Sequence, residues 1–196
     1  MPTNSQFWNQ ASIEPKRQFR WLLYIAGMPQ FIVKNVKKPS FSVTETGHDF
    51  LNYKFYYPGR VEWATVDVTI VDPVQPDSTA SLVKILEAAG YVLPDKFTSQ
   101  ANEPRTISKK AFVDSLGGQI QLVQFGANTG AQQENVLEKW TLNNPFLTNV
   151  DFGNLDYGSD ELVDISMTIR YDWAALELPD RTDSSRTWDL NNTTTN

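Results

Sequence analysis

The sequence contains no cysteine and only one histidine, His48, among its 196 residues. The lack of cysteine excludes disulfides, thiolate nucleophiles and thiolate metal ligands, and it fits a reducing compartment. A Ser-His-Asp triad would need His48, which lies in a turn-like Gly-His-Asp stretch with no nucleophile-elbow pattern nearby. We therefore expect a protein that is not an enzyme and that has no catalytic residue, metal or cofactor.

Long apolar runs and basic patches are also lacking. No run could span a bilayer, and the first residues lack the basic and apolar regions of a signal peptide, so no membrane contact is expected. The net charge is −6 and the pI is about 4.8, which argues against gripping nucleic acid through its phosphates. The same balance is compatible with a surface that nucleic acid must pass without sticking, but ordinary solubility is the simpler interpretation of the charge alone.

Acidic residues are dense between Asp151 and Asp172, but they do not form a recognisable metal loop. A calcium loop places its ligands at alternate positions with a fixed Gly and a closing Glu, and Asp156, Asp160 and Glu161 do not fit that spacing. A solvated acidic rim is the simpler interpretation. Gly117-Gly118 lacks the Lys and Ser/Thr of a phosphate-binding loop and instead indicates the end of a helix.

The strongest pattern that is present runs from Glu161 to Trp173. Apolar and polar residues alternate strictly from Val163 onward, and side chains in a strand point to opposite faces in turn. The pattern predicts a long antiparallel-type strand with one face on a core and one on water. The buried face should carry every second residue: Val163, Ile165, Met167, Ile169, Tyr171 and Trp173.

Other stretches supply partners for this strand. Further strands are expected at residues 17–26, 30–36, 40–46, 63–71, 119–125, 135–142 and 146–152, the first two forming a hairpin across Gly27-Met28-Pro29. Helical spacing marks residues 77–89, and a shorter second helix fits 108–116. The predicted fold is mainly β: two packed antiparallel sheets, sandwich- or barrel-like, with one flanking α-helix.

An aromatic cluster lies between two turn-like stretches, Gly47-His48-Asp49 and Pro58-Gly59-Arg60. Five of the eight residues from Phe50 to Tyr57 are aromatic. One interpretation is a core strand of a sandwich, because aromatic residues favour strands. The other, which we prefer, is a hairpin that contacts a partner, since aromatic residues are enriched at interface cores. The interface residues predicted are Phe50, Tyr53, Phe55, Tyr56, Tyr57 and Arg60.

Composition divides the chain into three parts. Residues 1–16 are expected to form an N-terminal arm with Phe7-Trp8 as a docking pair, and residues 17–175 the β domain. Residues 176–196 are expected to form a polar tail, with Trp188 as its one candidate anchor.

The order of landmarks over residues 17–174 resembles a known family. They are the Lys-rich linker 34–39, Pro58-Gly59-Arg60, the strand Trp63–Val71, a helix, the Trp140 strand, Asn143-Asn144-Pro145, Thr148-Asn149-Val150, Leu155-Asp156-Tyr157 and Tyr171-Asp172-Trp173. This order is similar to that of the tail tube proteins of contractile-tailed, T-even-like bacteriophages. The chain extends beyond the compact pattern of that family at both ends.

The resemblance implies a structural virion protein made in the host cytoplasm and located in the tail. Six copies would form a ring, and stacked rings would form a tube inside the sheath, with tape measure and baseplate proteins as further partners. DNA would pass through the lumen without specific binding. An open-edged, half-wet sheet agrees with closure into a barrel around a channel. Candidate lumen-facing residues are Thr65, Asp67, Thr69, Asp164, Ser166 and Thr168.

Three alternatives to this interpretation remain. The nearest is a tube-initiating baseplate protein, which shares the fold, or the inner tube protein of a contractile injection system. A monomeric β-sandwich binding module would use the Phe50–Tyr57 aromatics for a ligand such as a carbohydrate. An enzyme ranks last.

Overall fold

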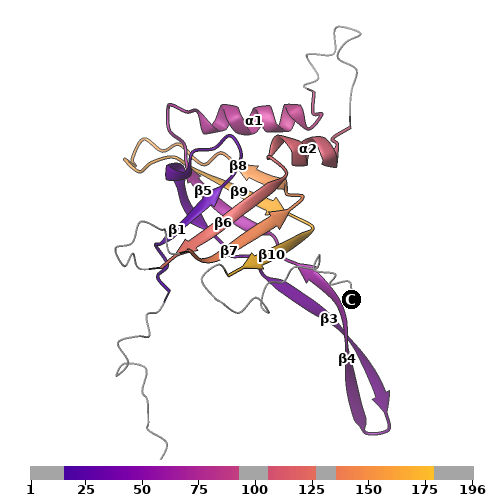
Figure 1. The fold of residues 1–196 in the computed structure, drawn as a ribbon. Coiled ribbons are helices and arrows are strands. Elements are labelled where there is room, and N and C mark those ends of the chain that lie inside the picture. Colours follow the sequence, from indigo (N-terminus) through magenta and orange to yellow (C-terminus); the bar gives the residue numbers. More distant parts are fainter. Residues whose placement is uncertain (1–15, 93–105, 127–135, 179–196) are drawn as a thin grey trace, which may run out of the picture.

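A computed structural model describes residues 16–92, 106–126 and 136–178. Two four-stranded antiparallel sheets pack face to face, and a two-stranded ribbon projects from one end of the pair (Figure 1). The predictions for Phe7-Trp8 and Trp188 concern residues outside these ranges. Neither helix in the described ranges has the length and apolar character needed to cross a membrane.

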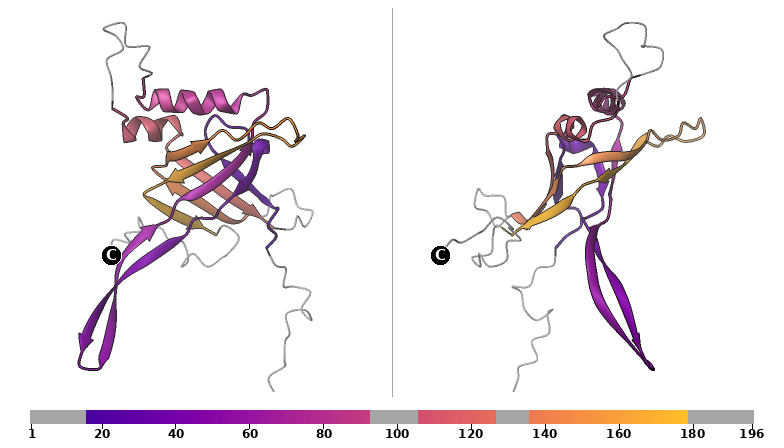
Figure 2. Two further views of the ribbon diagram at one scale, coloured as in Figure 1. Left: turned by 180° about the vertical axis from the view of Figure 1, so that it is seen from behind. Right: turned by 90° about the vertical axis from the view of Figure 1, so that its right-hand side faces the viewer.

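The first sheet, sheet A, has the order β1-β6-β7-β10. Its strands are β1 (Trp21–Tyr24), β6 (Gln119–Phe125), β7 (Val136–Asn143) and β10 (Trp173–Glu177). The second, sheet B, has the order β2-β5-β9-β8. Its strands are β2 (Val33–Val36), β5 (Val66–Val71), β9 (Asp164–Arg170) and β8 (Phe146–Asp151). Figure 2 shows the two layers edge-on, with the helices across one side.

The core lies between the sheets and follows the strand period. Val66, Val68 and Ile70 of β5 are buried, as are Ile165, Met167 and Ile169 of the neighbouring β9. Leu23 of β1, Ile120 and Leu122 of β6 and Leu142 of β7 face them from sheet A and join the same cluster. The alternation in the printed sequence therefore predicted the inward face of sheet B correctly.

Two helices close one side of the sandwich. Helix α1 (Ser78–Ala88) begins after Asp77, whose side chain accepts a hydrogen bond from the Ala80 N–H, and helix α2 (Lys109–Ser115) begins after Ser108 in the same way. Side-chain capping of this kind satisfies amide groups that have no partner inside the helix. The inner face of each helix packs into the core, through Leu82 of α1 and Phe112 of α2. Both helices lie where the helical spacing predicts them.

The predicted hairpin between residues 17–26 and 30–36 is wrong. Residues Gln30–Ile32 form a short 3-10 turn, η2. Strand β2 then pairs with β5 in sheet B, whereas β1 pairs with β6 in sheet A. The Gly27-Met28-Pro29 segment thus moves the chain from one sheet to the other. A turn signal marks a change of direction but does not specify which strands pair afterwards.

The expected continuous strand from Glu161 to Trp173 is interrupted. Strand β9 ends at Arg170, the chain crosses to the other sheet at Tyr171-Asp172, and β10 begins at Trp173. Asp172 secures this corner by accepting hydrogen bonds from Lys109 Nζ at 2.7 Å and Asn144 Nδ2 at 2.8 Å. After the corner Ala174 faces the core and Trp173 is 46% exposed, so the prediction that Trp173 is buried is wrong.

Candidate assembly surfaces

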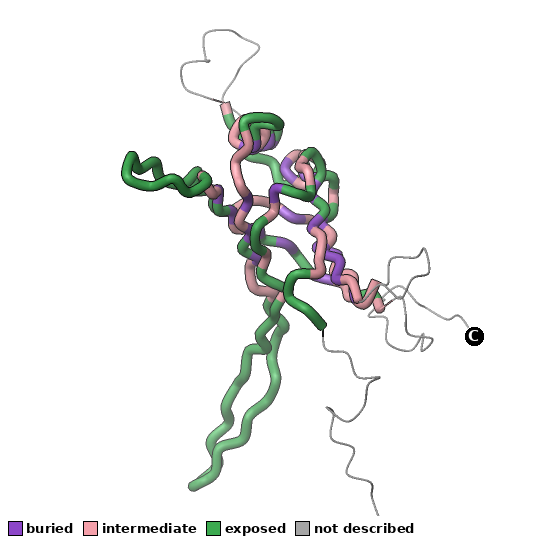
Figure 3. Tube along the Cα trace, turned by 90° about the vertical axis from the view of Figure 1, so that its left-hand side faces the viewer, coloured by how far each residue is buried: buried purple, intermediate pink, exposed green. Residues whose placement is uncertain are grey.

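The aromatic stretch forms the tip and part of one strand of a long exposed ribbon. Strand β3 (Phe41–Phe50) pairs antiparallel with β4 (Tyr53–Trp63), and the chain turns at Leu51-Asn52. The ten residues of β3 extend about 33 Å at roughly 3.3 Å per residue. Figure 3 shows the ribbon exposed along its length, away from the buried sandwich. Gly47-His48-Asp49 and Pro58-Gly59-Arg60 therefore lie within its strands, and the prediction that they are turns is wrong.

The register gives the ribbon one aromatic face. Phe50 lies opposite Tyr53, His48 opposite Phe55, and Thr46 opposite Tyr57. Directly paired residues share a face, and every second residue of a strand returns to it. Phe50, Tyr53, Phe55 and Tyr57 thus lie on one side, and each is at least 49% exposed. Tyr56 lies on the opposite side, with Lys54 Nζ 5.7 Å from its ring centroid.

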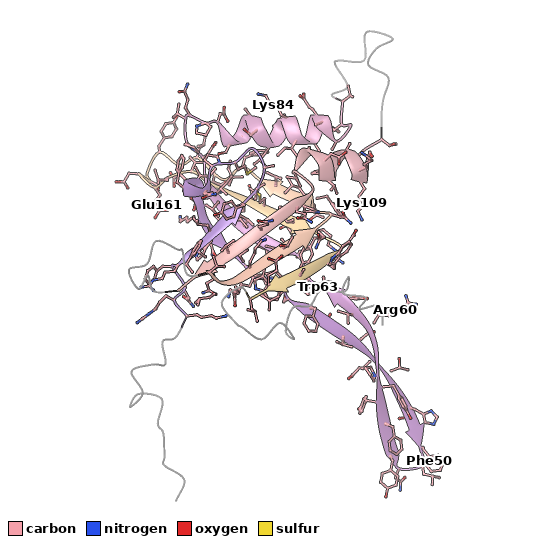
Figure 4. The ribbon with its side chains drawn as sticks, viewed as in Figure 1. Phe50, Arg60, Trp63, Lys84, Lys109 and Glu161 are labelled. Atoms are coloured by element: carbon pink, nitrogen blue, oxygen red, sulfur yellow. The ribbon has the colours of Figure 1, made fainter. Side chains whose placement is uncertain are left out.

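A β-bulge and an aromatic stack define the base of the ribbon. The register shifts between Val43 and Glu45, and the Arg60 N–H donates to Thr44 Oγ1 at 2.8 Å inside this bulge. Arg60 therefore lies near the base, apart from the aromatic face. Trp63 contacts Phe41 edge-on, with ring centroids 5.4 Å apart, and Tyr171 of the core at 6.0 Å. These contacts join the projecting ribbon to the sandwich (Figure 4).

Five of the six candidate lumen residues lie together on the outer face of sheet B. Asp67 is paired with Thr168, and Thr69 with Ser166, across β5 and β9. Thr168 Oγ1 donates to Asp67 Oδ1 at 3.0 Å, which orders two of the side chains. Asp164 begins the same face of β9, whereas Thr65 lies in the short connection between β4 and β5.

The charge on this outer face is mixed. Lys34 Nζ of β2 contacts Asp164 Oδ2 at 2.6 Å, and this hydrogen bond and charge raise the pKa of Lys34. Asp67 and exposed Asp151 add negative charge, and exposed Arg170 adds positive charge. The surface is polar and carries a small excess of carboxylates. It offers no cationic groove for phosphate groups.

A buried carboxylate closes one end of the space between the sheets, and the sequence patterns did not reveal it. Glu138 of β7 is 6% exposed and forms ion pairs with Lys16 and Lys38. Burial opposes its ionisation, but the two ammonium groups outweigh burial and lower the pKa of this carboxyl. Lys38 Nζ also donates to Gln124 Oε1 at 2.6 Å. A cavity of about 630 Å³ lies beside this cluster, between Trp21 and Val36.

Both sheets have open edges. Sheet B ends in β2 and β8, and neither sheet closes into a barrel within the described ranges.

The acidic residues of the described loop between β8 and β9 do not form a metal-binding cluster. Asp156, Asp160 and Glu161 are exposed in the loop between β8 and β9. His48 is exposed on the ribbon. Among the described residues no group of three or more His, Cys, Asp or Glu side chains is placed to bind a metal ion.

Comparison with known proteins identifies the fold. No family model and no curated protein matches the sequence. A chain of the anti-feeding prophage baseplate matches 86% of this chain and 99% of its own, with 11% identity and a TM-score of 0.59. A chain of the sheath–tube complex of an extracellular contractile injection system in the extended state matches 89% and 99%, with 14% identity and a TM-score of 0.55.

A third similar chain, from the cap that terminates the anti-feeding prophage tube, matches 91% of this chain and 99% of its own, with 14% identity and a TM-score of 0.56. All three matches cover almost the whole of the other chain. The chain therefore has the fold found in components of contractile injection systems. The fold implied by the resemblance to tail tube proteins is confirmed.

Proposed function

We propose that the chain is a structural subunit of the inner tube of a contractile tail or injection system. The observation that carries this proposal is the ribbon, whose aromatic face is unpartnered in the single chain. An isolated two-stranded hairpin is at best marginally stable in water. A ribbon about 33 Å long with one aromatic face is therefore best understood as a segment that packs against another copy.

Ring formation would use the open edges of sheet B. Strands β2 and β8 expose unpaired backbone groups, and joining the β2 edge of one copy to the β8 edge of the next removes both. Closure of such a sheet around an axis leaves a channel when many strands take part. Six copies are proposed by resemblance, and the similar baseplate structure is described as 6-fold symmetrised.

In this arrangement the outer face of sheet B would line the lumen. Its polar side chains and slight carboxylate excess would let DNA slide past without specific binding. Sheath, tape measure and baseplate proteins are the other partners proposed. The chain would act in the virion tail as part of the genome conduit, after synthesis in the host cytoplasm, and without catalysis, cofactor or metal.

Two other functions make different predictions. A tube-initiating or terminating protein would form a single ring that does not extend by itself; similar chains come from a baseplate and a cap as well as from a tube. A carbohydrate-binding module would stay monomeric and use the exposed aromatic face for stacking on a sugar. Whether the purified chain forms tubes, single rings or only monomers therefore distinguishes the three proposed functions.

The test is assembly of the purified full chain at high concentration, followed by negative-stain electron microscopy and sedimentation. We expect stacked rings or tubes, and we expect Phe55→Ser to weaken them while leaving the subunit folded. Tyr91→Ser, which removes a similarly exposed aromatic ring beyond α1, is the matched control and should assemble normally. Monomers that bind glycan through Phe55 would replace the tube proposal with the binding module.

A further inference from the structure

Sheet B is extended at both of its ends, in opposite directions. The ribbon joins β2 and β5 at the end where Val66 pairs with Ile169. The loop of residues 152–163 joins β8 to β9 at the other end, where Val71 pairs with Asp164. Figure 4 shows the two extremes, with Phe50 at the ribbon tip and Glu161 in the loop on the far side of the sandwich.

The end opposite the ribbon gathers exposed apolar side chains, which we call the apolar end. Its members are Phe31 (78% exposed), Val74 (94%), Leu155 (89%), Tyr157 (112%) and Leu162 (72%). Phe31 precedes β2, Val74 follows β5, and the other three belong to the loop, so all five leave the sheet at the same end. Clustered exposed apolar groups of this kind mark interaction surfaces more often than scattered ones do.

The loop also forms a cavity of about 620 Å³. Its lining includes Leu155, Tyr157, Leu162 and Val163, with the carboxylates of Asp156 and Glu161 among them. Cavities of roughly 300–1,000 Å³ accept drug-sized molecules, so this one has room for more than one aromatic side chain. The loop keeps its shape partly through Asp156, whose Oδ1 accepts a hydrogen bond from the Gly158 N–H at 2.9 Å.

The ribbon tip and this cavity have complementary chemistry. Residues 152–163 contain three carboxylates and no Lys, Arg or His. The tip supplies apolar rings from Phe50 and Tyr53, a phenolic hydroxyl from Tyr53 and the ammonium group of Lys54. Hydroxyl and ammonium donors satisfy carboxylate acceptors, while the rings fill apolar space. The tip has one carboxylate of its own, Asp49, which lies directly opposite Lys54.

We propose that the ribbon tip of one copy, Phe50–Lys54, docks into the cavity of the 152–163 loop of a second copy. This inference rests on the proposed tube function and adds the receiving surface, which resemblance alone does not give. The two surfaces differ, so the contact is head-to-tail and leaves a free ribbon and a free loop on every pair. Repetition of this contact links copies in a row that runs along the strand direction of sheet B.

The other cavity is a poorer receptor for the tip. Lys16, Lys34 and Lys38 line it, so its polar groups are mainly donors. The ribbon tip would bring a further ammonium group, that of Lys54, towards these lysines. Like charges repel, which makes this docking less favourable than docking beside carboxylates. Phe19 lines that cavity and supplies a control position.

Single-cysteine crosslinking tests the inference cleanly, because the chain has no cysteine of its own. Full-length Tyr53→Cys is mixed with Leu155→Cys and oxidised under assembly conditions, and the disulfide-linked dimer is measured on a non-reducing gel. We expect a crosslink in this mixture. Tyr53→Cys mixed with Phe19→Cys, an exposed position on the other cavity, should give none. Crosslinking to Phe19→Cys, or equal crosslinking in both mixtures, overturns the inference.

Electron microscopy of the same mixtures separates the two proposals. Stacked particles without a Tyr53–Leu155 crosslink would contradict the 152–163 loop as the docking site but would still support the proposed tube function. No particles and no crosslink would overturn both. A second pair of variants tests the contact without introduced cysteines. Lys54→Glu should lose stacking, and mixing this variant with Glu161→Lys should restore it. Unchanged stacking of Lys54→Glu alone would count against the charge pairing and overturn this docking arrangement.

Discussion

Glu138 links three segments of the chain through one buried carboxylate. It lies on β7 and binds Lys16, at the start of the described chain, and Lys38, between β2 and β3. Because its pKa is lowered in the native state, its stabilising effect is fully present above the ordinary value of 4.5. That effect is lost as the pH falls through the lower native value.

We predict that Glu138→Gln lowers the free energy of unfolding by about 1–3 kcal/mol at pH 7, because it removes charge-assisted hydrogen bonds from a buried site. The difference from wild type should hold above pH 4.5 and close at lower pH, where Glu138 also becomes neutral. Urea unfolding at several pH values measures this. Glu177→Gln breaks the more exposed pair with Lys139 and should cost less than about 1 kcal/mol. Equal losses for the two variants would contradict the prediction.

Trp173 and Met167 show how the burial of a residue determines its contribution to the free energy of unfolding. Met167 is 2% exposed in the centre of sheet B, whereas Trp173 is 46% exposed at the start of β10. We predict that Met167→Ala costs about 2–5 kcal/mol of unfolding free energy, as for other buried large-to-small changes. Trp173→Ala should cost only about 1–2 kcal/mol, since much of its side chain already contacts water. Denaturant midpoints with an unchanged m-value give the comparison, and a larger loss at Trp173 would refute it.

At the scale of elements, the ribbon depends on a close approach at its bulge. A Cβ added at Gly59 would lie 2.4 Å from Thr44 Oγ1 and 3.0 Å from the Thr44 carbonyl oxygen. We predict that Gly59→Val breaks the pairing near the ribbon base and abolishes assembly. The thermal midpoint of the sandwich should change little, because the ribbon lies outside the core. Circular dichroism and sedimentation report on the two properties separately.

Gly47→Ala is the matched control for this change in the same ribbon. Its added Cβ would meet only the flexible end of the Lys54 side chain, with Lys54 Cε at 2.7 Å, and that side chain can move aside. Normal assembly of Gly47→Ala together with loss in Gly59→Val would assign the effect to the bulge. Normal tubes from Gly59→Val would show that assembly does not need the ribbon in this form.

The sequence predicted elements better than their pairing. Alternation in Val66–Val71 and Asp164–Arg170 identified two strands and their buried face, helical spacing identified α1, and Gly117-Gly118 indicated the end of α2. Strand partners depend on contacts between distant segments, which local patterns do not contain. For this reason the turn signal predicts the wrong neighbour for β2. The alternation also predicts a buried Trp173, because the pattern continues across a corner where the chain changes sheets.

The sequence also predicted the candidate surfaces only in part. The aromatic density of Phe50–Tyr57 located the projecting ribbon, but only the register shows that Phe50 of β3 shares a face with Tyr53, Phe55 and Tyr57 of β4. Five polar residues assigned to one face of β5 and β9 do share it. The Glu138 cluster could not be found in advance, because each hydrogen bond from its lysines joins residues more than eighty positions apart in the sequence.

At the scale of the whole molecule, the orientation of sheet B can be measured in assembled particles. Ser166→Cys places one thiol on the outer face of sheet B, and Lys84→Cys places one on the exposed side of α1. If the outer face lines a lumen, a small maleimide should label both thiols, but a large polymer-linked maleimide should label only Lys84→Cys. Dissociated subunits should react at both positions with both reagents. Equal labelling by the large reagent in intact particles would place the outer face of sheet B on the exterior.

The ribbon and the 152–163 loop leave sheet B at opposite ends and differ in chemistry. A stack linked through them would be polar: all its ribbons would point one way, and its two tips would present different surfaces. Growth could then proceed at one tip while a different protein occupies the other. A molecule that covers only the loops would halt elongation in one direction, and one that covers only the ribbons would halt it in the other. Directionality of the whole assembly would thus follow from the asymmetry of a single sheet.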